Sequence, residues 1–465
     1  MATPPKRPEV RTEIPGPEAR ALIERGRFDM QSIYRTILVD DAASEGVWIR
    51  DVDGNWLLDL FSSFALGALG YNHPALVEVA RSPAFARAAA NATSTPFVTA
   101  PAWIAYVEAL QKRYAPPGAA RVFCVDGGGE GVEAALKAAF IVHGERRRLA
   151  AGEPKNPLEM PEAYLRAVMD NAGTDAICVS FGGAFHGRGF GSMTATHSKP
   201  VHKADVPAFR WPTAPFPAGR WPLRDHAEHN AAVEAECLAE LERILDANAG
   251  RVAAVLVEPV QSEGGDRHAS AAFFRGVQRL TKAAGAALVL DEVQTGCGIS
   301  GTLWCHEQFD LPVPPDLVCF GKKMQMGGFF ATADYDIRQF GRMYHTRNGD
   351  RARALLGEAT LREIVDGGLL ANVRETGALF LAGLEDLAKR HPALVTEPRG
   401  RGFLLAFDLP TPALRDDFLK RSMSRGVFAS YTGTRSVRLR PHLITGPAEV
   451  EIALAAFDAS LRDMS

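Results

Sequence analysis

The chain has 465 residues, of which 46% are hydrophobic and 23% charged, and its formal net charge at pH 7 is −3. This composition is typical of a globular protein with a large core, and no apolar run approaches the ~20 residues that span a bilayer, so we expect no membrane segment. The slightly acidic balance gives no reason to expect nucleic acid as a partner.

The cysteines and the N-terminus predict the cellular location of the protein. No two cysteines form a CxxC pair, and most lie in apolar runs, as small core residues do in a reducing compartment. The first eight residues contain no apolar stretch typical of a signal peptide. We therefore expect a cytoplasmic protein without a metal site. The six cysteines are Cys124, Cys178, Cys237, Cys297, Cys305 and Cys319.

The N-terminal part of the chain has short, mixed elements. Residues 1–35 are Pro-rich and then polar, and residues 47–59 have the pattern of a β-hairpin around the turn that begins at Asp53. Helical patterns follow over 75–81 and 101–113.

A strand over 121–125 leads into a glycine-rich turn, and a helical pattern follows from Ala134 to Phe140. Such a turn before a helix is typical of an anion site, because free backbone N–H groups point at the ligand. The sequence is not a Walker loop, since Gly-Lys-Ser/Thr is missing. A phosphate site and a plain tight turn fit equally well. The charged, Pro-interrupted residues 141–174 are expected to form a surface insertion.

Two further strands end in charged groups. A buried strand over 176–180 is followed by a glycine-rich loop that contains Arg188, a residue suited either to a carboxylate or to solvent. After a long helix over 224–248, a strand over 252–257 leads to Glu263, another acid near a strand end.

The central stretch contains two strands that each deliver one charge. The apolar run 286–290 ends at Asp291, and the stretch that begins at Asp316 ends at Lys322. These two charged residues are 322 − 291 = 31 positions apart, about one strand–helix–strand unit. Adjacent parallel strands would place both side chains at the sheet edge where α/β proteins bind ligands. An acid and a lysine so placed suit pyridoxal 5'-phosphate (PLP), whose aldehyde takes a lysine amine. The alternative is an ordinary salt bridge.

The alternation of strands and helices predicts an α/β protein with a mostly parallel central sheet. Helical patterns cover 351–391, and strands are expected over 400–407 and 436–440. We expect a large domain over 76–350. The smaller α+β domain would combine residues 1–75 with residues 351–465.

Four motifs carry a family resemblance: Gly183-Ala-Phe-His-Gly-Arg188, Glu258-Pro-Val-Gln-Ser-Glu-Gly-Gly-Asp266, Asp291-Glu-Val-Gln-Thr-Gly296 and Phe320-Gly-Lys-Lys323. With them, the chain resembles the class III aminotransferases of the PLP-dependent fold type I over nearly its whole length. The resemblance implies PLP as the cofactor and a homodimer with shared active sites.

The resemblance also implies the cofactor residues. Lys322 would form the Schiff base, with Lys323 as its rival, and Asp291 would hold the pyridine nitrogen. Phe185 and Val293 would pack on the two ring faces, while Thr346 would reach the phosphate from the neighbouring subunit. The implied set is Gly128, Gly129, Phe185, Asp291, Val293, Gln294, Lys322 and Thr346.

The implied substrate residues are Phe64, Arg188, Glu263, Gln294 and Arg438. Arg188 and Arg438 would each bind a substrate carboxylate, and Glu263 would neutralise Arg438 when no carboxylate does. The implied reaction transfers the amino group of an ω-amino acid, with 4-aminobutyrate first and lysine as the alternative, to 2-oxoglutarate. A non-catalytic PLP-fold binding protein is a more distant alternative.

Two departures from the family pattern qualify this resemblance. Gly127 and Glu130 stand where animal 4-aminobutyrate enzymes have cysteines for an iron–sulfur cluster, so we expect no cluster. Arg347 and Asn348 follow Thr346 where Thr-Trp is usual, which changes the expected subunit contact.

Overall fold

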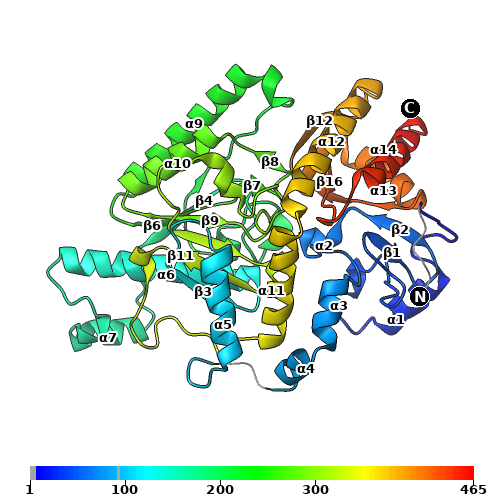
Figure 1. Cartoon of the computed structure of the whole chain (residues 1–465). Helices are drawn as coiled ribbons and strands as arrows, with labels where there is room; N and C mark the ends of the chain where they lie inside the picture. The colour runs from blue at the N-terminus through cyan, green and yellow to red at the C-terminus, as the bar shows by residue number, and fades with distance from the viewer. Residues whose placement is uncertain (1–6, 92–94, 465) are drawn as a thin grey trace.

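The computed structural model describes residues 7–91 and 95–464. Its larger unit is built on a seven-stranded sheet with the order β3-β11-β10-β9-β6-β4-β5 (Figure 1). All pairs from β10 to β5 are parallel, whereas β11 is antiparallel to both neighbours. The strands are β3 (Arg121–Val125), β4 (Ile177–Phe181), β5 (Thr213–Ala214), β6 (Val252–Val257), β9 (Ala287–Asp291), β10 (Leu317–Phe320) and β11 (Gly327–Ala331).

Both faces of this sheet are covered, which explains why its central strands are apolar without interruption. On β9, Ala287 and Val289 belong to the core shared with α6 (Gly128–Ala150). The alternate residues Leu288 and Leu290 belong to the core that contains side chains of the helices on the opposite face. These helices are α9 (Ala227–Ala247) and α10 (Ala271–Ala283).

Strand β11 is a finding that the sequence pattern did not predict. It lies between β10 and β3 in the sheet, and its backbone lies very close to the backbone of Phe123 and Gly127. A Cβ on Gly327 would lie 1.9 Å from the carbonyl oxygen of Gly127, and one on Gly328 would lie 2.1 Å from that of Phe123. The glycines therefore permit the close approach of this strand to its neighbours.

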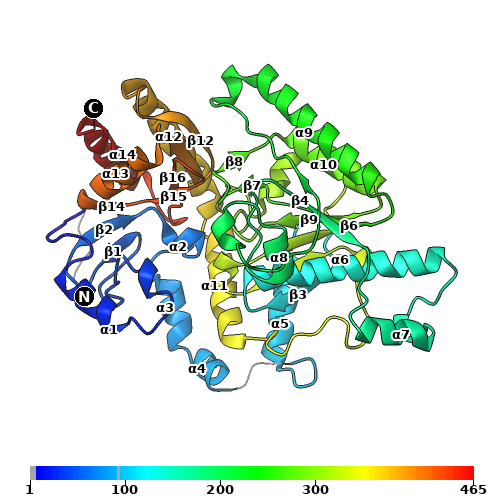
Figure 2. The ribbon, with the colours of Figure 1, turned by 180° about the vertical axis from the view of Figure 1, so that it is seen from behind.

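The smaller unit is built from both chain ends, as expected. Strand β14 (Val427–Phe428) pairs in parallel with β2 (Trp56–Asp59), which pairs with β1 (Trp48–Arg50). Figures 1 and 2 show these N-terminal strands beside the C-terminal helices α13 (Pro412–Ser424) and α14 (Pro447–Arg462). A separate hydrophobic core joins both ends of the chain here. The domain boundaries themselves stay predictions.

Two expectations need correction. The expected strand over 400–407 is a hairpin of β12 (Thr396–Arg401) and β13 (Leu404–Asp408), because the chain turns at Gly402 with φ of +59°. The expected insertion over 141–174 begins as the last ten residues of α6, and the short helix α7 (Glu162–Met169) follows. Charged residues on an exposed helix end resemble a loop in composition.

The remaining elements complete the described chain, in which no helix is long and apolar enough to cross a membrane. The helices are α1 (Pro17–Arg25), α2 (Ser62–Ala65), α3 (Pro74–Arg81), α4 (Pro83–Ala90), α5 (Pro101–Ala109), α8 (Phe190–Thr194), α11 (Arg351–Asp366), α12 (Leu369–Arg390), α13 (Pro412–Ser424) and α14 (Pro447–Arg462). The strands are β7 (Val260–Gln261), β8 (Arg267–His268), β15 (Ser430–Thr432) and β16 (Ser436–Leu439).

Candidate active site

A cavity of about 400 Å³ lies at the carboxyl edge of the central sheet. It brings together ten of the residues that the sequence predicted for a site, from segments far apart in the chain. These are Phe64, Gly128, Gly129, Phe185, Arg188, Glu263, Asp291, Val293, Gln294 and Lys322.

Two adjacent strands position the acid and the lysine. Strands β9 and β10 run parallel with Asp291 opposite Cys319, so Asp291 and Lys322 leave the sheet at the same edge. Lys322 has φ of +47°, a left-handed conformation that is uncommon for a residue other than glycine and is often found at functional sites. Burial lowers the pKa of Lys322 to about 8, against the opposing effect of Asp291. A larger share of this amine is therefore neutral and nucleophilic near pH 7.

The neighbouring Lys323 has a different environment. Its side chain is 1% exposed and does not line the cavity. Its Nζ donates a hydrogen bond to the carbonyl oxygen of Gln294 at 2.9 Å. This geometry favours Lys322 over Lys323 as the reactive amine.

The carboxylate of Asp291 is fixed by two hydrogen bonds. Its Oδ1 accepts from the backbone N–H of Val293 at 3.1 Å, and its Oδ2 lies 2.8 Å from Nδ1 of His186. His186 is buried, and its Nε2 has no partner among the described residues. We had not predicted His186 as a site residue. Its place beside Phe185 in the same glycine-rich loop was the signal for it.

A second buried acid, Glu258, also lines the cavity and was not among the predicted site residues. Its carboxylate accepts from the backbone N–H groups of Phe185 at 2.9 Å and Ser262 at 3.3 Å. Burial, followed by repulsion from Asp291, raises the pKa of Glu258 well above its ordinary value. The neutral form of Glu258 is therefore favoured in this cavity.

The glycine-rich turn forms an open cradle at the start of α6. The helix begins at Gly128 without a side-chain cap, so its first N–H groups are available to an anion. A Cβ on Gly128 would lie 2.4 Å from Cγ1 of Val293, whereas one on Gly129 would have no atom nearer than 3.7 Å. Gly128 is thus required for the packing of the cradle against Val293.

Glu263 bridges two cations at the other end of the cavity. Its Oε1 lies 2.6 Å from Nζ of Lys199, and its Oε2 lies 3.0 Å from Nη1 of Arg438. Burial raises the pKa of Glu263, but Arg438 and Lys199 outweigh this effect and hold it below the ordinary value. The guanidinium carbon of Arg438 also lies 5.1 Å from the centroid of the Phe64 ring.

Arg188, in contrast, has no hydrogen bond or ion pair with the described residues. Its guanidinium lies 5.5 Å from the centroid of the Phe185 ring, and its side chain is exposed to the cavity. The two arginines at the site therefore differ: Arg438 is neutralised by an internal acid, whereas Arg188 is free to bind an external anion.

The wall that carries Phe64 has an unusual backbone. Residues Ser62 to Ala65 all have positive φ, from 42° to 64°, which is a costly conformation for residues with a Cβ. Asp59 holds this turn by accepting from the backbone N–H groups of Phe61 and Ser62 at 2.8 and 2.9 Å. The side chain of Ser62 adds a bond of 2.7 Å to the carbonyl oxygen of Arg440.

Gln294 is oriented by Arg440, whose Nε donates to its Oε1 at 2.8 Å. Arg440 is itself fully buried and paired with buried Asp266. Thr346 lies outside the cavity in this chain and lines a separate hollow together with residues of α4. In the described part of the chain, no group of three or more His, Cys, Asp or Glu side chains is placed to hold a metal ion.

This fold and site are those of a known enzyme class. Residues 30–461 match the profile of the family described as Aminotransferase class-III, and the chain belongs to that family. The family uses PLP as its cofactor. The residues present fit this group, since the cavity combines an anion cradle, a buried acid and a lysine with a lowered pKa.

The chain is similar over most of its length to several named proteins. It is 39% identical to a 4-aminobutyrate aminotransferase of Dictyostelium discoideum, over 99% of this chain and 92% of the relative. It is 34% identical to the mitochondrial 4-aminobutyrate aminotransferase of Sus scrofa, over 98% and 91% of the two chains. Its structure is similar to the lysine aminotransferase of M. tuberculosis in the internal aldimine form, with a TM-score of 0.86, 33% identity, and coverage of 96% and 100%.

Proposed function

We propose that this protein is a transaminase that takes the amino group of an ω-amino acid, 4-aminobutyrate before others, and transfers it to 2-oxoglutarate. The observation that carries the proposal is the unequal state of the two arginines. Arg188 is unpaired, whereas Arg438 is paired with Glu263 at 3.0 Å. Curated relatives along the whole chain carry the name 4-aminobutyrate aminotransferase.

The two arginines explain how one site accepts two kinds of substrate. An ω-amino acid has its only carboxylate far from the reacting amine, where Arg188 binds it, and Glu263 neutralises Arg438 meanwhile. A dicarboxylate brings a second carboxylate to Arg438, so Glu263 must leave it. Lys199, which already contacts Glu263 at 2.6 Å, keeps that carboxylate paired after the exchange.

Bound PLP supplies an aldehyde that takes up the amine and a ring that accepts electrons. Asp291, which is oriented by His186, would stabilise positive charge at the ring nitrogen. The neutral amine of Lys322 would accept the proton from the amine-bearing carbon of the substrate and deliver it to C4′ of the cofactor. Phe185 and Val293 would hold the ring between them, and Gly128 with Gly129 would bind the phosphate through backbone N–H groups.

A lysine donor is the second candidate, because the structure is similar to that of a lysine aminotransferase with a TM-score of 0.86. Both donors present a primary amine on a methylene group. Lysine has a longer carbon chain and carries an α-amino group beside its carboxylate. A purely binding role would require a lost lysine or a lost arginine, and Lys322, Arg188 and Arg438 are all present at the cavity or beside it.

We further propose a homodimer with shared active sites, in which Thr346 reaches the phosphate in the partner subunit. Large exposed apolar side chains near Thr346 support an interface there. Phe97 and Phe340 are 68% and 84% exposed, and their ring centroids are 6.1 Å apart. Such exposed clusters are typical of protein interfaces. Sedimentation that shows a single chain at micromolar concentration would contradict the dimer.

We also propose a cytoplasmic location. All six cysteines are free and buried, as is usual in a reducing compartment. Cell fractionation that recovers the native protein in an organelle would contradict this proposal.

The substrate test compares two amines. The purified enzyme, loaded with PLP, is supplied with 2-oxoglutarate and either 4-aminobutyrate or lysine, and the aldehyde product is identified by mass spectrometry. We expect succinic semialdehyde to form with the higher kcat/KM. A cyclised lysine product without succinic semialdehyde would reverse the order of the two donors.

A further inference from the structure

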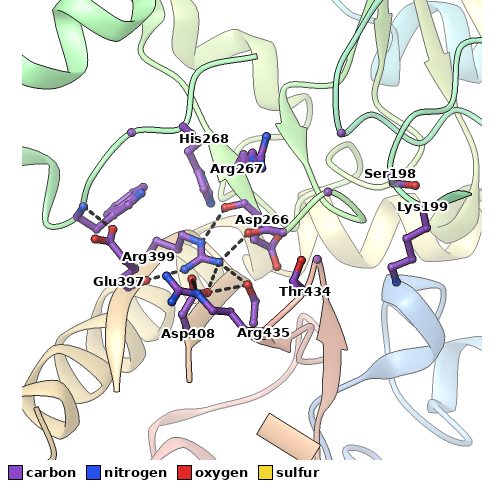
Figure 3. Close-up of a pocket in the computed structure, with 18 of the residues that line it drawn as sticks. Ser198, Lys199, Asp266, Arg267, His268, Glu397, Arg399, Asp408, Thr434 and Arg435 are labelled. Carbon is purple, nitrogen blue, oxygen red and sulfur yellow. Dashed lines mark hydrogen bonds and ion pairs between the residues drawn. The ribbon is translucent and has the colours of Figure 1, made fainter. Parts of the chain in front are cut away.

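A second cavity, of about 690 Å³, adjoins the candidate active site. The two cavities share one segment, because Glu263 lines the smaller cavity while Gly264 to His268 line the larger one. Lys199 also lines the larger cavity, and its Nζ contacts Glu263 at 2.6 Å. Figure 3 shows Arg399, Asp408 and Arg435 gathered on one side of this larger cavity and Lys199 on the other.

The lining of the larger cavity is positively charged, although the whole chain has a net charge of −3. Five cationic side chains face three acids there. The cations are Lys199, Arg220, Arg267, Arg399 and Arg435, and the acids are Asp266, Glu397 and Asp408.

The three acids are already bound to other protein groups. Asp408 is paired with Arg399 at 2.8 Å and Arg435 at 3.2 Å. Asp266 is paired through its Oδ1 with buried Arg440, while its Oδ2 has no partner among the described residues. Glu397 accepts a hydrogen bond from the backbone N–H of Trp221 at 2.8 Å.

Two of the cations, in contrast, have no bound counter-ion. The side chains of Arg220 and Arg267 are exposed and make no hydrogen bond or ion pair with the described residues. Each guanidinium presents five N–H donors in a planar fork, and pairs of these donors fit the oxygen atoms of a carboxylate or phosphate.

A buried histidine points to the same ligand chemistry. His268 is only 5% exposed, yet neither of its ring nitrogens has a hydrogen-bond partner in the part of the chain that the structure describes. The edge of its ring packs against Trp221, with ring centroids 5.3 Å apart. In Figure 3 its side chain extends toward Arg399. A buried ring N–H without a partner is uncommon, and a bound group is one of its ordinary explanations.

Burial, followed by the nearby Arg401, Arg399 and Arg440, holds the pKa of His268 well below its ordinary value. The ring is therefore neutral and has one N–H to donate. A neutral His268 can donate a hydrogen bond to an anion. It does so without the free-energy cost of a buried positive charge when no anion is bound.

We propose that the cavity lined by Arg220, Arg267 and His268 is a binding site for a small organic oxyanion, separate from the cofactor cavity. The ligand carries carboxylate or phosphate groups, which the two arginines bind at the rim and His268 binds at the floor. Thr434 also lines the cavity, and its hydroxyl suits the same oxygen-rich ligand.

Calorimetric titration of the PLP-loaded protein tests this proposal, with inorganic phosphate and glutarate as separate probes. The test variant is Arg220→Gln/Arg267→Gln, which changes only exposed side chains. The control is Arg279→Gln, an exposed arginine of α10 that lines neither cavity. Because glutarate also suits the substrate arginines, Arg188→Gln is titrated in parallel to identify binding at the cofactor cavity.

We expect one saturable binding component that the control and Arg188→Gln retain and that the double variant weakens by about tenfold or more. If phosphate alone shows it, the ligand is a phosphate ester; if glutarate does, it is a dicarboxylate. His268→Phe, which keeps the ring packing, should weaken the same component. Absence of saturable binding, or equal affinity in the double variant and the control, would overturn the proposal.

Discussion

Glu263→Gln tests the proposed exchange of partners at Arg438. In the structure the Arg438 side chain is 1% exposed and the Glu263 side chain 18%, so their ion pair is largely shielded from water. The half-reaction of an ω-amino acid keeps this pair, whereas that of a dicarboxylate must break it. The variant lacks the pair in both half-reactions, so the dicarboxylate no longer has to displace an internal acid.

The expected change is the free energy of the pair. Breaking a buried pair costs about 3–5 kcal/mol. Since Glu263 is partly exposed and glutamine still accepts a hydrogen bond from Arg438, we expect about 2–3 kcal/mol here. The ratio of kcat/KM for glutamate to kcat/KM for 4-aminobutyrate should therefore rise roughly 30- to 150-fold.

The assay is a single-turnover half-reaction of the loaded enzyme with each amine, followed by the absorbance of the cofactor. Glu242→Gln, on the exposed face of α9, serves as the control for loss of one negative charge. An unchanged ratio, within about threefold, would refute the reasoning, because both half-reactions would then depend equally on Glu263.

Two further predictions concern the cofactor residues. Gly128→Ala places a methyl group 2.4 Å from Val293 and should weaken PLP affinity about 5- to 150-fold in a titration of the unloaded protein. Gly129→Ala, whose added methyl group has no atom nearer than 3.7 Å, should change the affinity little. Equal losses of affinity would contradict the proposed packing of this turn against Val293. Because only the neutral amine attacks an aldehyde, the rate of PLP capture by the unloaded protein should rise with pH around the lowered pKa of Lys322, about 8. Lys323→Met should keep this midpoint, and a midpoint near 10.5 would contradict the burial of the amine.

Much of the sheet could be predicted because its strands are buried on both faces. The runs that end near Asp291 and Glu258 are continuously apolar, and the structure places them as β9 and β6. Strand β11 could not be predicted in the same way. Gly327 and Gly328 lower strand propensity. Only the close approach to β3 and to the turn that follows it, which is a tertiary contact, explains why glycine is required there.

The candidate site shows the same limit. Charged residues near strand ends indicated Asp291, Lys322 and Glu263, and the resemblance to the family indicated the other predicted residues of the cavity. His186 and Glu258 were missed because their importance depends on burial beside Asp291, which sequence spacing does not show. The likeness to the family indicated Thr346, but a single chain does not bring it to the cavity, so its role stays a prediction.

The larger cavity could not be predicted from sequence. Its arginines come from separate segments, and charged residues in such segments are usually solvated. Only the fold places Arg220 and Arg267 around one cavity and leaves His268 without a partner.

The most direct measurement locates the amine that holds the cofactor. Borohydride reduction of the loaded enzyme makes the bond between PLP and its lysine permanent, and tandem mass spectrometry of the digested protein then assigns the added mass. We predict the mass on Lys322, in the wild-type protein and in Lys323→Met. The mass on Lys323 instead would contradict the account, because that amine does not line the cavity that contains Asp291.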